Sequence, residues 1–167
     1  MKKRTTILLS LTMALALSFS GCGQNVIGSE TADHTYNMNS ALDAGQYCNF
    51  VNKQINAVIN QLSSNMLMGK SVARGDCSIN DAIATAKQSI SIIESALNEV
   101  DIMIPPNQYQ DTRAHTLQLM KKSKSDIQMY IDELSKSSPD KEKIYKLCSE
   151  MNSDFTALSS EFNVYYE

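Results

Sequence analysis

Residues able to perform acid–base, redox or metal chemistry are few in this chain of 167 residues. Its histidines and cysteines are His34, His115, Cys22, Cys48, Cys77 and Cys148. No C-x-x-C, H-E-x-x-H or E-x-x-H pattern occurs, so zinc-ribbon, thioredoxin-type, zinc-protease and di-iron sites lack their ligand sets. Serine-nucleophile and phosphate-loop motifs are also absent. The sequence therefore predicts no catalytic residue, no metal and no cofactor apart from a covalent lipid.

Cys22 follows a segment that has the three parts of an export signal. Residues 2–4 are basic, residues 5–19 are mostly apolar without any charge, and Ser20 and Gly21 are small. The apolar run is shorter than the roughly 20 residues that a spanning helix needs. We therefore expect residues 1–21 to be a cleaved signal peptide.

The residues Phe19-Ser20-Gly21-Cys22 resemble the lipobox of bacterial lipoproteins, in which the cysteine thiol receives a diacylglyceryl group. The usual pattern has leucine where this chain has Phe19, and the resemblance covers residues 1–22 only. It implies that Cys22 carries acyl chains such as palmitate on the extracytoplasmic face of the cell membrane. Two or three acyl chains hold a protein stably at the membrane, whereas a single chain binds only weakly and reversibly. The alternative is an ordinary secretory signal followed by an incidental cysteine.

The composition of the remaining 146 residues suits one acidic, helical domain. Three of the fifteen basic residues lie in the signal and none of the 18 acidic residues does, so the mature chain has 12 basic and 18 acidic residues, a formal charge of −6. This charge argues against a nucleic-acid partner and against a basic face on anionic lipid. Tryptophan is absent and glycine and proline are few, which favours helices over a β-sandwich.

Apolar residues recur at alternating steps of three and four in four segments behind a polar tether at residues 22–38. The helices predicted by this pattern cover about residues 40–68, 78–104, 107–135 and 139–166. The apolar positions predicted to face the core are Ala41, Ala44, Cys48, Val51, Ile55, Val58 and Leu62; Ile79, Ile83, Ala86, Ile90, Ile93, Leu97, Val100 and Ile104; Leu117, Met120, Ile127, Ile131 and Leu134; and Ile144, Cys148, Met151, Phe155, Leu158, Phe162 and Tyr165. The pair Pro105-Pro106 ends the second of these helices. Residues 39–167 are therefore predicted to form an all-α, antiparallel up-down-up-down four-helix bundle. A dimer of long helical hairpins is the alternative, because such regular patterns also pair between chains.

Residues that start or stop helices indicate where these segments end. Gly69 is expected to end the first helix, with a loop at residues 69–77. Ser78 and Asn107 are expected to cap the second and third helices, each with a polar residue three positions on. Pro139 suits the first position of the fourth helix.

Polar residues interrupt the apolar pattern in two places. Four asparagines of the first helix favour a solvated face over a ligand-binding one. They are Asn49, Asn52, Asn56 and Asn60. In the third helix Lys124 falls where an apolar residue is expected, so either its chain extends to solvent or Ser123 takes the inward place.

The cysteines that remain once Cys22 is lipidated are odd in number and cannot all pair within one chain. Cys48 and Cys148 fall at apolar helix positions, which predicts small buried side chains. An up-down-up-down bundle places Cys77 at its distal end, Cys148 roughly 14 Å from that end and Cys48 near the other end. A disulfide needs Cα atoms within about 7 Å, so no intrachain disulfide is predicted.

Two short patterns could bind or catalyse. Asp111 and His115 stand four apart on the third helix, which fits a metal edge or a base, although an ordinary surface pair explains them better. Arg74-Gly75-Asp76 lies in the expected distal loop and resembles the tripeptide that integrins recognise. It is the partner-binding candidate of this sequence, and its alternative is a plain Gly-Asp turn before a helix cap.

The sequence thus predicts a membrane-anchored, non-enzymatic binding module at the cell envelope, with the Pro105-Pro106 turn facing the membrane. An inhibitor or immunity-type lipoprotein that blocks another protein is one alternative. An enzyme or redox protein with a site built from scattered polar residues is the other, and a pocket with convergent titratable groups would favour it.

Overall fold

The computed structural model describes residues 42–165, except for the side chain of Asn163, and these residues belong to one compact unit. Its helices are α1 (Ala44–Arg74), α2 (Ile79–Ile102), α3 (Gln110–Leu134) and α4 (Lys141–Val164), and a short 3₁₀ turn, η1 (Asn107–Tyr109), precedes α3. The described part contains no strand, so the predicted all-helical class is confirmed. The expected signal peptide, Cys22 and the tether lie outside the described residues.

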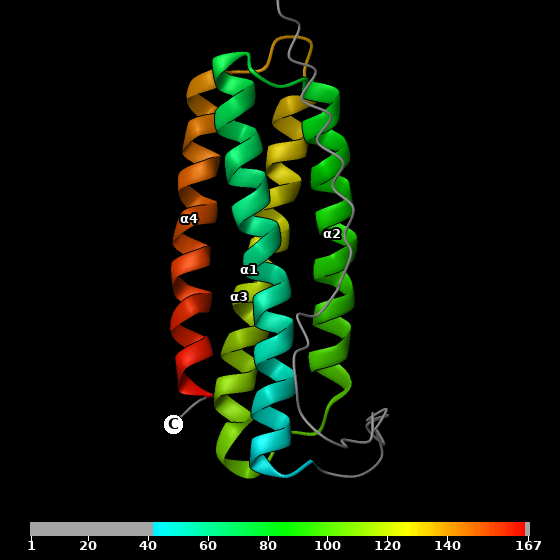
Figure 1. The fold of residues 1–167 in the computed structure, drawn as a ribbon, viewed down its shortest axis with the longest axis vertical. Coiled ribbons are helices and arrows are strands. Elements are labelled where there is room, and N and C mark those ends of the chain that lie inside the picture. The colour runs from blue at the N-terminus through cyan, green and yellow to red at the C-terminus, as the bar shows by residue number, and fades with distance from the viewer. Residues whose placement is uncertain (1–41, 166–167) are drawn as a thin grey trace, which may run out of the picture. The chain divides into compact units, whose positions relative to one another are not determined.

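The four helices form a bundle in which each packs against the next, and α4 packs back against α1. Figure 1 shows the α1–α2 and α3–α4 connections at one end, here called the distal end, which holds residues 75–78 and 135–140. The start of α1 and residues 103–109 lie at the other end, here called the proximal end.

The predicted apolar positions form the core of this bundle. Side chains of α1 at Val51, Ile55, Val58 and Leu62 are fully buried. The predicted positions of the other helices that are also buried are Ala86, Ile93, Leu97, Val100, Leu117, Met120, Ile127, Ile131, Leu134, Ile144, Cys148, Met151, Leu158 and Tyr165. The three-four spacing therefore identified the inward face of every helix.

The prediction that Gly69 ends the first helix is wrong, because α1 continues to Arg74 and Gly75 ends it with a left-handed φ of 82°. The amide of Gly75 donates to the carbonyl of Val72 (2.9 Å), as a left-handed helix cap requires. Gly69 is a packing residue instead. A Cβ there would lie 2.5 Å from Cys148 Sγ, so glycine lets α1 approach α4 closely.

Two other predicted helix starts differ from the structure. Asn107 begins the 3₁₀ turn rather than α3, and its side chain accepts a hydrogen bond from Gln110 Nε2 at 3.3 Å. Pro139 does not occupy the first position of α4, because the helix begins at Lys141. Asp140 caps it, since its carboxylate accepts from the amides of Glu142 (2.9 Å) and Lys143 (3.4 Å) and so satisfies two free amides of the first turn.

The burial of several side chains differs from the prediction. Ile79 and Ile104, predicted to lie in the core, are 37% and 53% exposed, because Ile79 is the first residue of α2 and Ile104 lies two residues beyond its end. Asn52 is buried, whereas the other three asparagines of the expected solvated face are exposed. Ser123 takes the inward place and Lys124 does not, as one of the two alternatives predicted.

Candidate functional site

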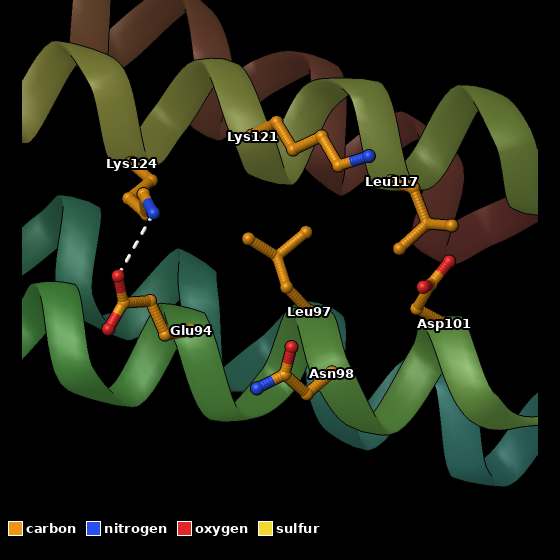
Figure 2. A pocket seen from close by; sticks show the side chains of 7 residues that line it. All are labelled: Glu94, Leu97, Asn98, Asp101, Leu117, Lys121 and Lys124. Atoms are coloured by element: carbon orange, nitrogen blue, oxygen red, sulfur yellow. Dashed lines mark hydrogen bonds and ion pairs between the residues drawn. The ribbon is translucent and has the colours of Figure 1, made fainter.

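A groove of about 490 Å³ lies between α2 and α3 and is the candidate binding site of the described residues. Figure 2 shows the side chains that line it. They are Glu94, Leu97, Asn98 and Asp101 from α2, with Leu117, Lys121 and Lys124 from α3. These residues recur at steps of three and four along each helix, so each set forms a single stripe.

The groove has an apolar floor and walls of opposite charge. Leu97 and Leu117 extend into the space between the helices and are almost fully buried (Figure 2). The α2 wall carries Glu94 and Asp101, and the α3 wall carries the two lysines. Lys124 Nζ lies 2.9 Å from Glu94 Oε1, but both side chains are about half exposed, so this pair contributes less than about 1 kcal/mol.

Lys121 differs from Lys124 because it has no ion-pair partner among residues 42–165. Its side chain is exposed and its ammonium extends along the groove towards Leu117 (Figure 2). An ammonium beside an apolar floor can bind a carboxylate whose neighbouring atoms are apolar. Asn98, exposed on the opposite wall, adds an amide that can donate and accept.

Arg113 fixes the proximal end of the groove. Its Nε donates to the carbonyl of Val100 (3.1 Å), and its Nη2 donates to the carbonyl of Asp101 and lies 3.3 Å from the Asp101 carboxylate. The guanidinium thus satisfies carbonyls at the C-terminus of α2, where a positive charge also complements the helix dipole. This contact holds Asp101 in position on the groove wall.

A second cluster, at the proximal end, includes the predicted candidate His115. Its Nδ1 lies 2.8 Å from Glu161 Oε1 of α4, and Thr116 Oγ1 donates to Glu161 Oε2 at 3.1 Å. Asp111 is exposed, and the expected partnership of His115 with it is replaced by this contact across helices. The Thr116 hydroxyl also lies 3.1 Å from the hydroxyl of Tyr165, whose pKa burial raises to about 12.

When the Nδ1–H of His115 donates to Glu161, its Nε2 has no hydrogen-bond partner among residues 42–165, and the side chain is 57% exposed. A carboxylate that orients an imidazole is part of many acid–base and metal sites. No group of three or more potential metal ligands occurs among the described residues. The cluster therefore offers one oriented base.

A third cluster buries charge between α3 and α4. Lys122 Nζ bridges Asp126 Oδ2 (2.8 Å) and Asp154 Oδ1 (2.6 Å), and both carboxylates are almost fully buried. Asp154 Oδ2 has no hydrogen-bond partner within the described part. Burial raises the pKa of Asp154, and the nearby Asp126 adds to that rise against the opposing effect of Lys122. These contacts join α3 to α4.

Glu133 forms a fourth polar cluster at the distal end of α3. Its carboxylate lies 2.7 Å from Lys136 Nζ and 3.0 Å from Lys143 Nζ, and it accepts from the amide of Asp140 at 3.0 Å. The hydrogen bonds from Lys136, the Asp140 amide and Lys143 lower the pKa of Glu133 to about 2. A wider hollow of about 830 Å³ beside this turn includes Lys136, whose ammonium is already bound to Glu133.

The structure places the partner-binding candidate Arg74-Gly75-Asp76 at the exposed distal end, as one unit. Arg74 Nε lies 2.7 Å from Asp76 Oδ2, so the two charged residues of the tripeptide form an ion pair with each other. A partner that contacts both would have to separate them, and binding at this tripeptide stays a prediction. The thiols of Cys48, Cys77 and Cys148 are free in the described part.

The groove and the two buried charge clusters were not predicted from the sequence. A signal existed, since Glu94 and Asp101 flank Leu97 on one helix stripe, and Lys121 and Lys124 follow Leu117 on another. Which stripes face each other depends on how the helices are rotated and aligned, and a single sequence does not give this.

No described helix has the length and apolar character required to cross a membrane. No protein-family model matches the chain, and neither the curated proteins nor the solved structures contain a match.

Proposed function

We propose that the protein is a lipid-anchored extracytoplasmic lipoprotein whose bundle is a non-enzymatic binding module. The lipid anchor is Cys22, and the bundle is antiparallel with up-down-up-down topology. The alternating ends of the helix connections support this topology (Figure 1). The export-signal pattern of residues 1–21 and the small residues before Cys22 support the anchor.

The groove between α2 and α3 carries the binding proposal. It combines a leucine floor, opposite charges on facing walls and an ammonium, that of Lys121, without a partner in the described part. Binding sites commonly pair apolar surface with a few placed polar groups. The ligand that fits is a segment of another protein with an acidic residue next to an apolar one.

Site-specific photocrosslinking in the native envelope tests this assignment. A photoreactive amino acid at Asn98 lies in the groove, and the matched control is the exposed Asn56 on α1. We expect position 98 to capture a partner that position 56 does not capture. Equal capture at both positions would show that the groove is not the binding site.

A charge substitution separates specific capture from random contact. The change Lys121→Glu should abolish the crosslink from position 98, because it places a negative charge where the ligand carboxylate binds. The control Lys53→Glu changes another exposed lysine, on α1, and should leave the crosslink intact. Persistence of the crosslink in the Lys121→Glu protein would contradict the proposed contact.

The anchor has its own test. Replacement of Cys22 by alanine removes the thiol that accepts the lipid, so the protein should leave the membrane fraction and lose incorporation of labelled palmitate. Labelling that persists after this substitution would refute lipid attachment at Cys22.

An enzyme is the second candidate, and the observation that favours it is His115, oriented by Glu161 with its ring exposed. Elemental analysis of protein purified from its native envelope tests its metal-dependent form. Stoichiometric iron or zinc would favour the enzyme over the binding module. An inhibitor or immunity-type lipoprotein would use the same groove, and the identity of the captured protein distinguishes that role.

A further inference from the structure

Two large apolar side chains are exposed at the proximal end of the bundle. Ile102 is 51% exposed and Ile104 is 53% exposed, while Met103 between them is buried at 2%. Pro105-Pro106 follows and turns the chain into η1. The two isoleucines thus form an apolar tip, defined here as Ile102 and Ile104, on the connection from α2 to α3.

The two residues of the apolar tip are each about half exposed and lie two positions apart where α2 ends. Single exposed apolar residues are common on protein surfaces, whereas contiguous exposed apolar surface marks sites of contact with partners or membranes. The same connection buries Met103 in the core, which fixes the conformation of the tip from the inside. The buried Met103 therefore keeps Ile102 and Ile104 in a fixed position, where both are exposed at the proximal end.

We propose that Ile102 and Ile104 insert into the surface of the lipid bilayer to which Cys22 is attached. This inference rests on the proposed lipid anchor and adds a second contact between the protein and the membrane. The anchor would hold the bundle near the bilayer, and the apolar tip would set which end of the bundle touches it.

The path of the chain favours the bilayer as the occupant. The start of α1 lies at the same end as the tip (Figure 1), and Cys22 precedes Leu42 by 20 residues. A chain of this length spans at most about 70 Å when fully extended. The end of the bundle that the anchored chain enters is therefore held within about 70 Å of the membrane, which raises the effective concentration of a weak apolar contact at that end.

The charges around the tip indicate which lipids it contacts. Asp43, Asp101 and Asp111 are exposed at the proximal end, whereas Arg113 is engaged with the C-terminus of α2. Acidic groups are repelled by anionic headgroups and tolerate zwitterionic ones. Contact through the tip should therefore rely on apolar burial and weaken as the anionic lipid content rises.

Tryptophan fluorescence provides a direct test, because the natural chain has no tryptophan. The variant Ile104→Trp places the only such fluorophore in the tip, and Ser137→Trp places it at the exposed distal end as the matched control. Both lipidated proteins are reconstituted through Cys22 into phosphatidylcholine vesicles, with and without bromine atoms near the top of the acyl chains. We expect position 104, and not position 137, to shift its emission to shorter wavelength and to be quenched.

Each outcome of this test has one meaning. If position 104 is not quenched while the protein remains bound to the vesicles, the apolar tip does not insert, and the anchor still stands. If the protein does not bind vesicles at all, the anchor fails as well. Equal quenching at positions 104 and 137 would mean that the bundle contacts the bilayer along its side, which also overturns the inference.

A second copy of the chain is the competing occupant of the tip. The Cys22→Ala protein with tryptophan at position 104 tests this in solution without vesicles. Emission that shifts to shorter wavelength as protein concentration rises, together with a dimer in sedimentation, would show that the tip binds another copy and would overturn membrane insertion. Emission at the wavelength of exposed tryptophan at all concentrations supports the bilayer.

Discussion

Helix α3 uses similar lysines in opposite ways on its two sides. Lys121 and Lys124 face α2 across an open groove, where one is without a partner in the described part and the other forms a half-exposed pair. Lys122 faces α4, where it bridges two buried carboxylates. The α3–α4 interface therefore uses charge to hold helices together, and the α2–α3 interface leaves charge available to a partner.

The α1–α4 interface resembles the α3–α4 interface, because both are closely packed, whereas the α2–α3 interface contains the open groove. Because Gly69 has no side chain, α1 and α4 approach so closely that Cys148 Sγ lies where a side chain at position 69 would be. A surface that binds a partner gains from exposed groups in fixed positions, which the open interface provides and the closed interfaces do not. Substitutions on the two sides should consequently have different effects on stability and on binding.

The largest expected effect on stability is that of Lys122→Ala. It leaves Asp126 and Asp154 buried together without a counter-charge, and we expect a loss of about 2–3 kcal/mol in the free energy of unfolding, below the range for a fully buried pair because Lys122 is half exposed. Urea unfolding measures it. The control Lys121→Ala should change the value by less than about 0.5 kcal/mol. Equal losses for both lysines would refute the distinction between the two interfaces.

The next effect is that of Gly69→Ala. The added methyl group meets Cys148 Sγ and the ring of Tyr130, so we expect a loss of about 1–3 kcal/mol in stability, measured by urea unfolding. The double variant Gly69→Ala with Cys148→Ala should recover part of it, because it removes the sulfur. The control Gly45→Ala adds a methyl group at an exposed helical site and should be neutral or stabilising. A neutral Gly69→Ala protein would show that the contact between α1 and α4 can relax.

Glu133 and Asp154 should change the free energy of unfolding with pH in opposite directions. The pKa of Glu133 is lowered to about 2, so its contribution is present above its ordinary pKa and is lost as pH falls towards 2. The pKa of Asp154 is raised, so the folded state holds its proton more tightly and stability falls as pH rises above the ordinary aspartate range.

Two variants separate these dependences in urea unfolding between pH 2 and 7. Glu133→Gln should lose the rise in stability between about pH 2 and 4.5. Asp154→Asn should lose the fall assigned to Asp154 and gain about 1 kcal/mol at neutral pH, the size of one hydrogen bond, since an amide can donate to Asp126. A loss of stability in the Asp154→Asn protein at neutral pH would show that the charged form of Asp154 is the one the fold requires.

The sequence predicted the helical class and most of the core because every helix keeps one apolar stripe. Val51, Ile93, Met120 and Leu158 are buried where the three-four spacing placed them. Gly69 misled the prediction, since a glycine that permits close packing resembles one that ends a helix until the neighbouring helix is known. Ile104 was assigned to the core because the spacing continues past Ile102, where α2 ends.

The groove and the buried charges could not be predicted because they depend on pairs of residues far apart in the chain. Lys122 and Asp126 are neighbours on one helix, but nothing local indicates that Asp154 completes the cluster. The same holds for His115 and Glu161, whose contact replaced the expected local partnership with Asp111. Periodicity determines which face of a helix turns inward, and the relative alignment of two helices determines which polar groups meet.

The binding proposal is tested most directly by the affinity of the Lys121→Glu protein for the partner captured at position 98. We expect a loss of about tenfold or more in affinity, equivalent to about 1.4 kcal/mol, with an unchanged free energy of unfolding. The Lys53→Glu protein should bind as the natural protein does. Unchanged affinity in the Lys121→Glu protein would contradict the claim that the open side of α3 is the binding surface.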